Sequence, residues 1–363
     1  MAVCWRLIDF DATDPPPWVK EKGASGVPPV KEMIEDILVF QKRWQDLSKE
    51  DQQESLKDFV PSYITHVCVE EDLGLQKKSD AITIFRSMQH EFMEFETKPD
   101  GEELGQHKFS ESDSQSKKKR ETANLIHAWG HLRKLNCSES PDKDSLAGLV
   151  DIEVCVLQTH KIIMDGLVDK QNKTPGGKFS TRTRHTTYKG EKHNYPEFES
   201  HKKAREAVQL ICDQYNALIN GIKDLVDPCD RMYKMFKCAA WLLFNLVSLH
   251  PFSDGNGRLC RLLCSYALSV STPFPSPIYN VYSPTKKNDY MDGIVSARKR
   301  EPQYPMELTT LIIESNWFAW KAVFNRNNTY SEDAGNENEL VAKETEYEEA
   351  PVPATVERDQ DSA

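Results

Sequence analysis

Residues 250–261 concentrate the most reactive side-chain types of this chain in a single turn. Their sequence is HPFSDGNGRLCR, with one histidine, one aspartate, two glycines around an asparagine, and two arginines. His250 is able to take up a proton near neutral pH, which makes it a candidate general base. Asp254 offers a hard oxygen ligand of the kind that Mg²⁺ prefers. A base beside a metal ligand predicts transfer of a phosphorus-containing group to a hydroxyl.

The glycine turn within this stretch separates two helical patterns and therefore lies at a helix amino terminus. Backbone N–H groups point outward at such a terminus and bind anions, and Gly255 and Gly257 leave room for a phosphate. Arg258 and Arg261 lie three positions apart on one helix face, where both can grip phosphoryl oxygens. Each element alone is compatible with an ordinary helix–helix turn, but their combination favours a phosphate site.

The composition is that of a globular protein, with 363 residues, 39% hydrophobic and 28% charged. The net charge of −11 argues against a nucleic-acid binder. No segment has the apolar length that spans a bilayer, so we expect no membrane association. Nine cysteines without metal-site spacing fit a reducing compartment and predict a cytoplasmic protein. The basic run at 117–120 leaves a nuclear location as an alternative, although a solvated loop end is the favoured interpretation.

Helical periodicity extends over most of the chain and predicts a mainly α fold. We expect helices over residues 30–56, 60–95, 121–135, 146–167, 202–225, 231–248, 259–269 and 306–324. Residues 174–196 are threonine-rich around Lys189-Gly190 and carry the one convincing hairpin pattern. No repeat period is visible.

Changes in composition divide the chain into three predicted parts. An amino-terminal arm and helix (1–56) begins with a proline-rich irregular stretch. A helical domain (57–325) contains an inserted polar loop at 97–120. An acidic tail (326–363) has too little apolar surface to fold, so we expect it to be disordered.

The stretch at 250–261 also fits the complete signature of the Fic family, HPFx(D/E)GNGRxxR. The chain resembles Fic domains over roughly residues 60–325, including 124–135, 159–166, the Pro-Gly-Gly-Lys-Phe segment and Tyr290. This resemblance implies a Fic-type helical bundle with a small β-hairpin flap. It also implies a protein adenylyltransferase, which moves AMP from ATP to a serine, threonine or tyrosine hydroxyl of a target protein. Removal of AMP by the same site, or nucleotide binding without turnover, are the alternatives.

The resemblance assigns a role to each signature position. His250 would be the general base, Asp254 would hold Mg²⁺, and Phe252 would anchor the loop. The nucleotide phosphates would be lined by Gly255, Asn256, Gly257 and Arg258, with Arg261 reaching the terminal phosphate. Gly257 favours adenylylation, because phosphorylating relatives carry lysine at that position.

The hairpin at 174–196 would be the flap that pairs with an extended, hydroxyl-bearing segment of the target. Its assigned contact residues are Lys178, Phe179, Ser180 and Thr181. The oligomeric state stays open, with a homodimer as one alternative.

Many Fic proteins carry an inhibitory helix with the pattern (S/T)xxxE(G/N), whose glutamate pairs with the second signature arginine. The corresponding stretch here is Thr65–Asp72, which departs from the pattern because His66 takes the hydroxyl position. We predict that Glu70 is the inhibitory residue and that it pairs with Arg261. Glu314, in the stretch Thr-Leu-Ile-Ile-Glu-Ser, is the rival candidate.

Overall fold

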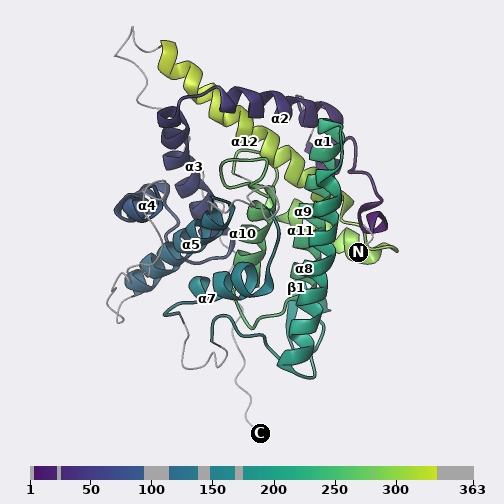
Figure 1. The fold of residues 1–363 in the computed structure, drawn as a ribbon. Helices are drawn as coiled ribbons and strands as arrows, with labels where there is room; N and C mark the ends of the chain where they lie inside the picture. Colours follow the sequence, from purple (N-terminus) through teal and green to yellow (C-terminus); the bar gives the residue numbers. More distant parts are fainter. Residues whose placement is uncertain are drawn as a thin grey trace. The chain divides into compact units, whose positions relative to one another are not determined.

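A computed structural model describes residues 4–22, 26–93, 114–137, 148–167, 175–279 and 281–332. The mainly α architecture is confirmed, with one antiparallel hairpin (Figure 1). The helices are η1 (Trp5–Ile8), α1 (Pro17–Lys22), α2 (Val30–Gln45), α3 (Lys49–Glu70), α4 (Lys78–Met93), α5 (Ser114–Cys137), η3 (Ile152–Gln158), α7 (Thr159–Ile163), α8 (His201–Lys223), α9 (Pro228–Leu249), α10 (Asn256–Leu268), α11 (Lys287–Lys299) and α12 (Met306–Glu332). The strands are β1 (His185–Tyr188) and β2 (Glu191–Asn194).

Helix α10 is the central element of the bundle and carries both signature arginines. Apart from Gly257, every residue of this helix is buried. It packs against α9, α5 and α7, and α9 in turn packs against α8 (Figure 1). A helix that is covered on all sides normally carries apolar side chains all round. Arg258 and Arg261 are buried in this helix, so their guanidinium groups require polar or anionic partners there.

Aromatic packing joins α2 to the first part of α12. Trp320 is fully buried, with its ring centroid 6.1 Å from that of Trp44 and 4.8 Å from that of Phe274. The predicted helix 30–56 is two helices, because the Ser48 side chain caps α3 by accepting from the Asp51 N–H at 3.1 Å. The boundary expected at 56/57 therefore falls inside α3. The described residues up to Val323 form one compact unit.

Two further expectations differ from the structure at their ends, and one helix was not expected. Helix α5 begins at Ser114, so residues 114–120 are helical rather than part of the inserted loop, as their lysine-rich composition permits. Residues 97–113 lie outside the described part of the chain. Helix α12 continues through 332, and the rest of the expected tail, 333–363, also lies outside it. Helix α11 was not predicted, because its buried positions are mostly small or polar.

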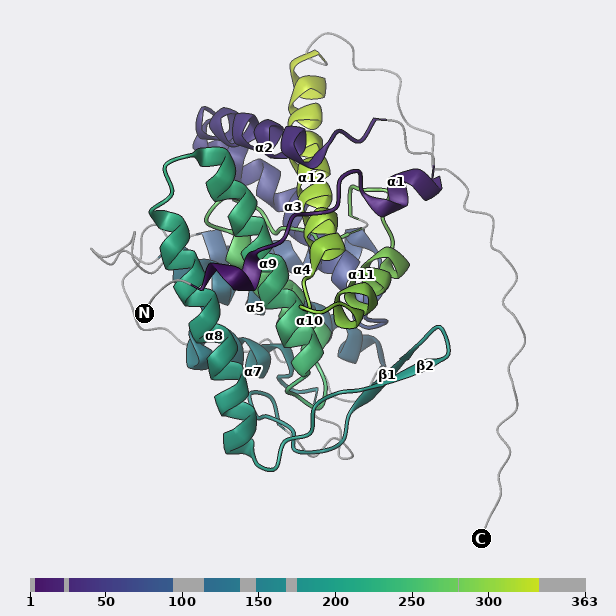
Figure 2. The same cartoon turned by 90° about the vertical axis from the view of Figure 1, so that its right-hand side faces the viewer.

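The hairpin turns at Lys189-Gly190, where both residues have positive φ, 50° and 79°. Two such residues form the tight turn whose twist matches the flanking strands. The turn pairs Tyr188 with Glu191. The hairpin extends past α11 (Figure 2), and the Lys189 ammonium at its turn lies 2.8 Å from a carboxylate oxygen of Asp292 in that helix. No helix within the described residues has the length and apolarity to cross a bilayer.

Candidate active site

The signature begins where α9 ends, in a backbone conformation that is rare outside glycine. His250 is the C-cap residue of α9 and adopts the left-handed conformation, with φ 49° and ψ 58°. A non-glycine residue in that region is strained, and strain of this kind gathers at functional sites. The cap turns the chain sharply and directs residues 251–255 across the amino terminus of α10.

Gly255 is required by both conformation and space. Its φ is 76°, and a Cβ added there would lie 3.0 Å from the Met164 sulfur and 3.1 Å from His160 Nε2. The backbone of the turn therefore lies directly against the side chains of residues 160 and 164. No other residue fits there without strain.

Asn256 fixes the shape of the turn through two bonds to one residue. Its Oδ1 accepts from the Phe252 N–H at 3.0 Å, and its Nδ2 donates to the Phe252 carbonyl at 2.8 Å. The Phe252 side chain is fully buried, with its ring centroid 3.7 Å from that of His160 and 5.1 Å from that of Phe179. Asn256 therefore serves the loop itself, and Phe252 anchors that loop in the core.

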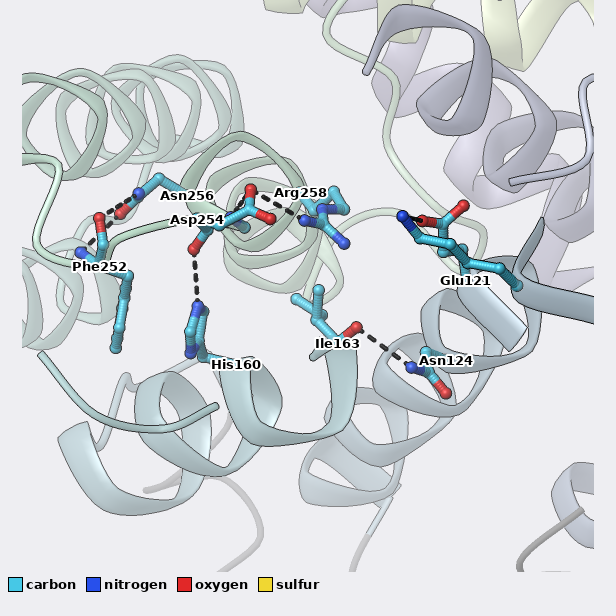
Figure 3. Close-up of polar contacts among 10 residues, drawn as sticks. Glu121, Asn124, His160, Ile163, Phe252, Asp254, Asn256 and Arg258 are labelled. Carbon is cyan, nitrogen blue, oxygen red and sulfur yellow. Dashed lines mark hydrogen bonds and ion pairs between the residues drawn. The ribbon is translucent and has the colours of Figure 1, made fainter. Parts of the chain in front are cut away.

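His160 supports the turn from below, a contact that sequence reasoning missed. Its Nδ1 accepts from the Gly177 N–H at 2.9 Å, so its Nε2 carries the proton and donates to the Asp254 carbonyl at 2.9 Å (Figure 3). Burial lowers the pKa of His160 to about 4, which keeps it neutral.

Asn124 of α5 holds the end of α7, the helix that carries His160, through the carbonyls of Ile163, at 3.2 Å, and Asp165, at 2.8 Å. The segment 159–166 resembles Fic domains in sequence, and that was the one signal for His160.

Asp254 presents a carboxylate at the mouth of the turn. Its Oδ1 accepts from the Gly255 N–H at 2.6 Å and from Arg258 Nη2 at 3.1 Å (Figure 3). The Arg258 side chain is 5% exposed, whereas that of Asp254 is 50% exposed. A half-exposed carboxylate beside a buried guanidinium is suited to hold a hard cation at the site entrance.

The imidazole of His250 lies against the flap side of the site. Its ring centroid is 3.9 Å from that of Tyr195, and the two planes differ by 9°. Burial, followed by the positive charge of Arg184, lowers the pKa of His250 to about 4. His250 is therefore neutral and able to accept a proton across the physiological pH range.

Arg261 makes its ion pair with Glu71, so the predicted pair between Glu70 and Arg261 is wrong by one residue. Arg261 Nε lies 3.1 Å from Glu71 Oε1. Glu70 is the last residue of α3, whereas Glu71 is its cap and leaves the helix toward α10. Glu70 reaches Arg261 through Tyr279, whose hydroxyl accepts from Arg261 Nη2 at 2.7 Å and donates to Glu70 Oε2 at 3.0 Å.

The Glu71 carboxylate also lies directly over Gly257. A Cβ added at Gly257 would be 2.5 Å from Glu71 Oε1 and 2.7 Å from Oε2. The glycine therefore makes space for an anionic group at the amino terminus of α10, where helix ends bind anions. Glu314 lies elsewhere, fully buried in α12, and accepts from the Trp18 indole at 2.6 Å.

The four predicted flap contacts, Lys178–Thr181, precede the strands and lie along the signature. The Ser180 N–H donates to the Pro251 carbonyl at 2.9 Å. Arg184 ties this loop together, because its guanidinium donates to the carbonyls of Ser180 at 3.1 Å and Arg182 at 2.7 Å. The structure thus brings the flap to the same turn that carries His250.

A helical bundle around a central signature helix, with a docked hairpin, is the fold of Fic proteins. Residues 153–268 match the model of the Fic/DOC family, and the recognition of a Fic domain is confirmed.

Solved structures of similar fold include Fic-1 from C. elegans, with a TM-score of 0.53 and 15% identity over 86% of this chain and 75% of that one. A Fic domain containing signaling protein from Bacteroides thetaiotaomicron has a TM-score of 0.51 and 17% identity over 81% and 97%. At these identities the likeness concerns the fold alone.

Curated relatives match shorter segments. A ribonucleoside-diphosphate reductase small chain of Ostreid herpesvirus 1 is 27% identical over 175 residues, which are 48% of this chain and 26% of that protein. A Fido domain-containing protein of Dictyostelium discoideum is 54% identical over 44 residues, 12% of this chain and 31% of that protein. The chain thus matches less than a third of the length of either relative.

Proposed function

We propose that this chain is a protein adenylyltransferase, which transfers AMP from ATP to a serine, threonine or tyrosine hydroxyl of a target protein. The observation that carries the proposal is the turn at the amino terminus of α10. There a neutral His250, the Asp254 carboxylate and two buried arginines surround an anion-binding position, which the Glu71 carboxylate occupies. This arrangement suits a reaction between a hydroxyl and a nucleotide phosphate.

In this reaction the target hydroxyl oxygen attacks the α-phosphorus of ATP. The bond from that phosphorus to the oxygen that bridges to the β-phosphate breaks, and pyrophosphate leaves. The hydroxyl proton passes to the imidazole of His250. Gly255, Asn256, Gly257 and Arg258 line the phosphates, and Arg261 binds the terminal one.

Mg²⁺ fits the residues present. Asp254 offers the carboxylate ligand that this cation prefers, and its side chain is half exposed beside the amino terminus of α10. When bound, the cation would neutralise phosphate charge. Arg258 would supply further positive charge at the same point, because it is held against Asp254.

We further propose that the resting enzyme is autoinhibited by Glu71. Its carboxylate holds Arg261 and lies over Gly257, so it competes with a terminal phosphate for both. ATP bound beside it would have a misplaced α-phosphate, which slows transfer without abolishing binding.

Labelled ATP tests the reaction. The full chain is incubated with Mg²⁺ and with ATP labelled at the α- or the γ-phosphate, as wild type and as Glu71→Gly. We expect α-label on the protein and no γ-label. Incorporation of γ-label would contradict AMP transfer and indicate phosphorylation. If an AMP-modified chain loses AMP while ATP gives no label, the reverse reaction is the activity.

A further inference from the structure

The imidazole of His250 stacks on an aromatic ring that has no role in the reaction described above. The Tyr195 ring lies parallel to it, 3.9 Å away between centroids and 9° between planes. Tyr195 is 8% exposed and follows β2 directly, so it belongs to the flap. A parallel ring at this distance covers one whole face of the imidazole and excludes water from it.

Tyr195 is itself held from several sides. Its N–H donates to the Arg184 carbonyl at 2.9 Å, and the His193 ring meets it edge-on at 5.2 Å. The guanidinium carbon of Arg298, from α11, lies 5.7 Å from the Tyr195 centroid. Arg298 Nε also donates to Ser248 Oγ at 3.3 Å, in the last turn of α9. The tyrosine therefore joins the flap, α11 and the end of α9.

The position of His250 explains why such a partner matters. The residue caps α9 in a left-handed conformation, which fixes the direction of its backbone but not the plane of its ring. The plane of the ring depends on its own contacts, which are a hydrogen bond to the Val247 backbone and the stacked Tyr195 ring. A general base must hold its accepting nitrogen within hydrogen-bond reach of the hydroxyl. A misplacement of about 1 Å at such a group can cost about 100-fold in rate.

We propose that Tyr195 is a positioning residue for His250: its ring fixes the plane of the imidazole, and Arg298 holds Tyr195 in place. This inference rests on the proposed function. Because Tyr195 belongs to the flap that would receive the target, the contact links the docking element to the base.

The charged groups around His250 also affect whether its imidazole is protonated. Arg184 from the flap and Arg298 from α11 disfavour protonation of the imidazole, whereas Glu71 at the end of α3 favours it. Burial acts in the same direction as the two arginines and outweighs both Glu71 and a hydrogen bond to the Val247 backbone, so the pKa of His250 is lowered to about 4. Removal of the tyrosine ring exposes the imidazole, so the pKa should rise toward its ordinary value of about 6.5.

The test compares three substitutions in the full chain. Tyr195→Phe keeps the ring and serves as the conservative control. Tyr195→Leu keeps apolar volume without a flat face, and Tyr195→Ala removes both. The imidazole resonances of His250 are followed by NMR during a pH titration and are assigned by their absence in His250→Gln. This readout is independent of turnover, so it stays decisive even if the chain transfers no AMP.

We expect Tyr195→Phe to stay close to the wild type in resonance positions and pKa, because it keeps the stacked ring and the Arg298 contact with that ring, although it loses the hydrogen bonds of the hydroxyl to Arg298 and Thr186. Tyr195→Leu and Tyr195→Ala should both shift the resonances and raise the pKa by one unit or more. In the transfer assay both should lower kcat by about 10- to 100-fold with little change in the KM for ATP. The proposal is overturned if the His250 resonances and pKa are the same in all variants, or if Tyr195→Phe is as damaging as Tyr195→Ala.

Discussion

The two ends of the signature are held by different kinds of contact. At residues 250–256 the partners are backbone groups: Asn256 binds the N–H and carbonyl of Phe252, and His160 binds the carbonyl of Asp254. At Arg261 the partners are a carboxylate and a phenol. A nucleotide phosphate cannot replace the first set, but it can replace a carboxylate. The loop is therefore preformed, and the arginine end is exchangeable.

Burial gives the proposed exchange at Arg261 a physical reason. The Arg261 side chain is 4% exposed, and a buried guanidinium without an anion is strongly destabilising. When Glu71 moves away, another anion must take its position. The terminal phosphate of ATP has the charge and the bidentate geometry for that contact.

The largest expected effect comes from the fixed end. His250→Ala in the Glu71→Gly background should lower the rate of AMP transfer by about 10² to 10⁴, because the proposed general base is lost. ATP binding, measured by calorimetry, should change little, since His250 lies outside the glycine turn. Undiminished transfer by this variant would show that another group accepts the proton.

The exchangeable end should respond in the opposite direction. If the Glu71 pair favours the resting state by about 2 to 3 kcal/mol, Glu71→Gly should raise self-modification by roughly 30- to 150-fold. Glu70→Gly is the matched control and should have a much smaller effect, because Glu70 contacts Arg261 through Tyr279. A larger gain in Glu70→Gly than in Glu71→Gly would reverse the assignment.

The rigidity of the loop predicts a stability effect at Asn256. Asn256→Ala leaves the N–H and the carbonyl of Phe252 unpaired in the core, and it should lower the free energy of unfolding by about 2 kcal/mol. Asn245→Ala is the control, since Asn245 makes one bond to the Trp241 carbonyl within α9. Urea unfolding of both variants compares the two losses. Equal losses would contradict a special role for the Asn256 clamp.

The smallest expected effect is a pH dependence near the arginine end. His66 packs edge-on against Tyr279, and burial lowers its pKa to about 3. The unfolded chain binds this proton near pH 6.5, so the contribution of His66 to stability falls as the pH drops from 6.5 toward 3.

Substitution of His66 isolates this contribution. The wild type should lose about 1 to 2 kcal/mol more than His66→Phe between pH 7 and pH 5, measured by urea unfolding. Parallel pH profiles of the two proteins would mean that His66 titrates normally in the folded state.

The contacts that the sequence predicts well are local ones. The Asn256 clamp and the Asp254–Arg258 pair each join residues four positions apart, so the spacing of the signature already contains them. The carboxylate partner of Arg261 lies 190 positions away, and its identity depends on the residue at which α3 ends. The pattern for the inhibitory helix pointed to the segment that contacts Arg261, but it did not show that Glu71, at the end of α3, makes the ion pair in place of Glu70.

The contacts of Tyr195 and His160 could not be predicted from the sequence for the same reason, since they join residues far apart in the chain. Neither residue belongs to a sequence spacing that marks a site, and both acquire their roles from packing against a turn that lies far along the chain. Helix α11 was missed for a related reason, since its buried residues include Gly293 and Ala297, which give no strong apolar period.

The central claim is that Arg261 exchanges Glu71 for a phosphate of the nucleotide. The most direct measurement compares transfer from α-labelled ATP by Glu71→Gly and by Glu71→Gly combined with Arg261→Ala, with ATP binding measured in both. The account predicts that the double variant falls back to the wild-type rate or below it, because the freed arginine is itself the phosphate ligand. A double variant as active as Glu71→Gly alone would contradict it.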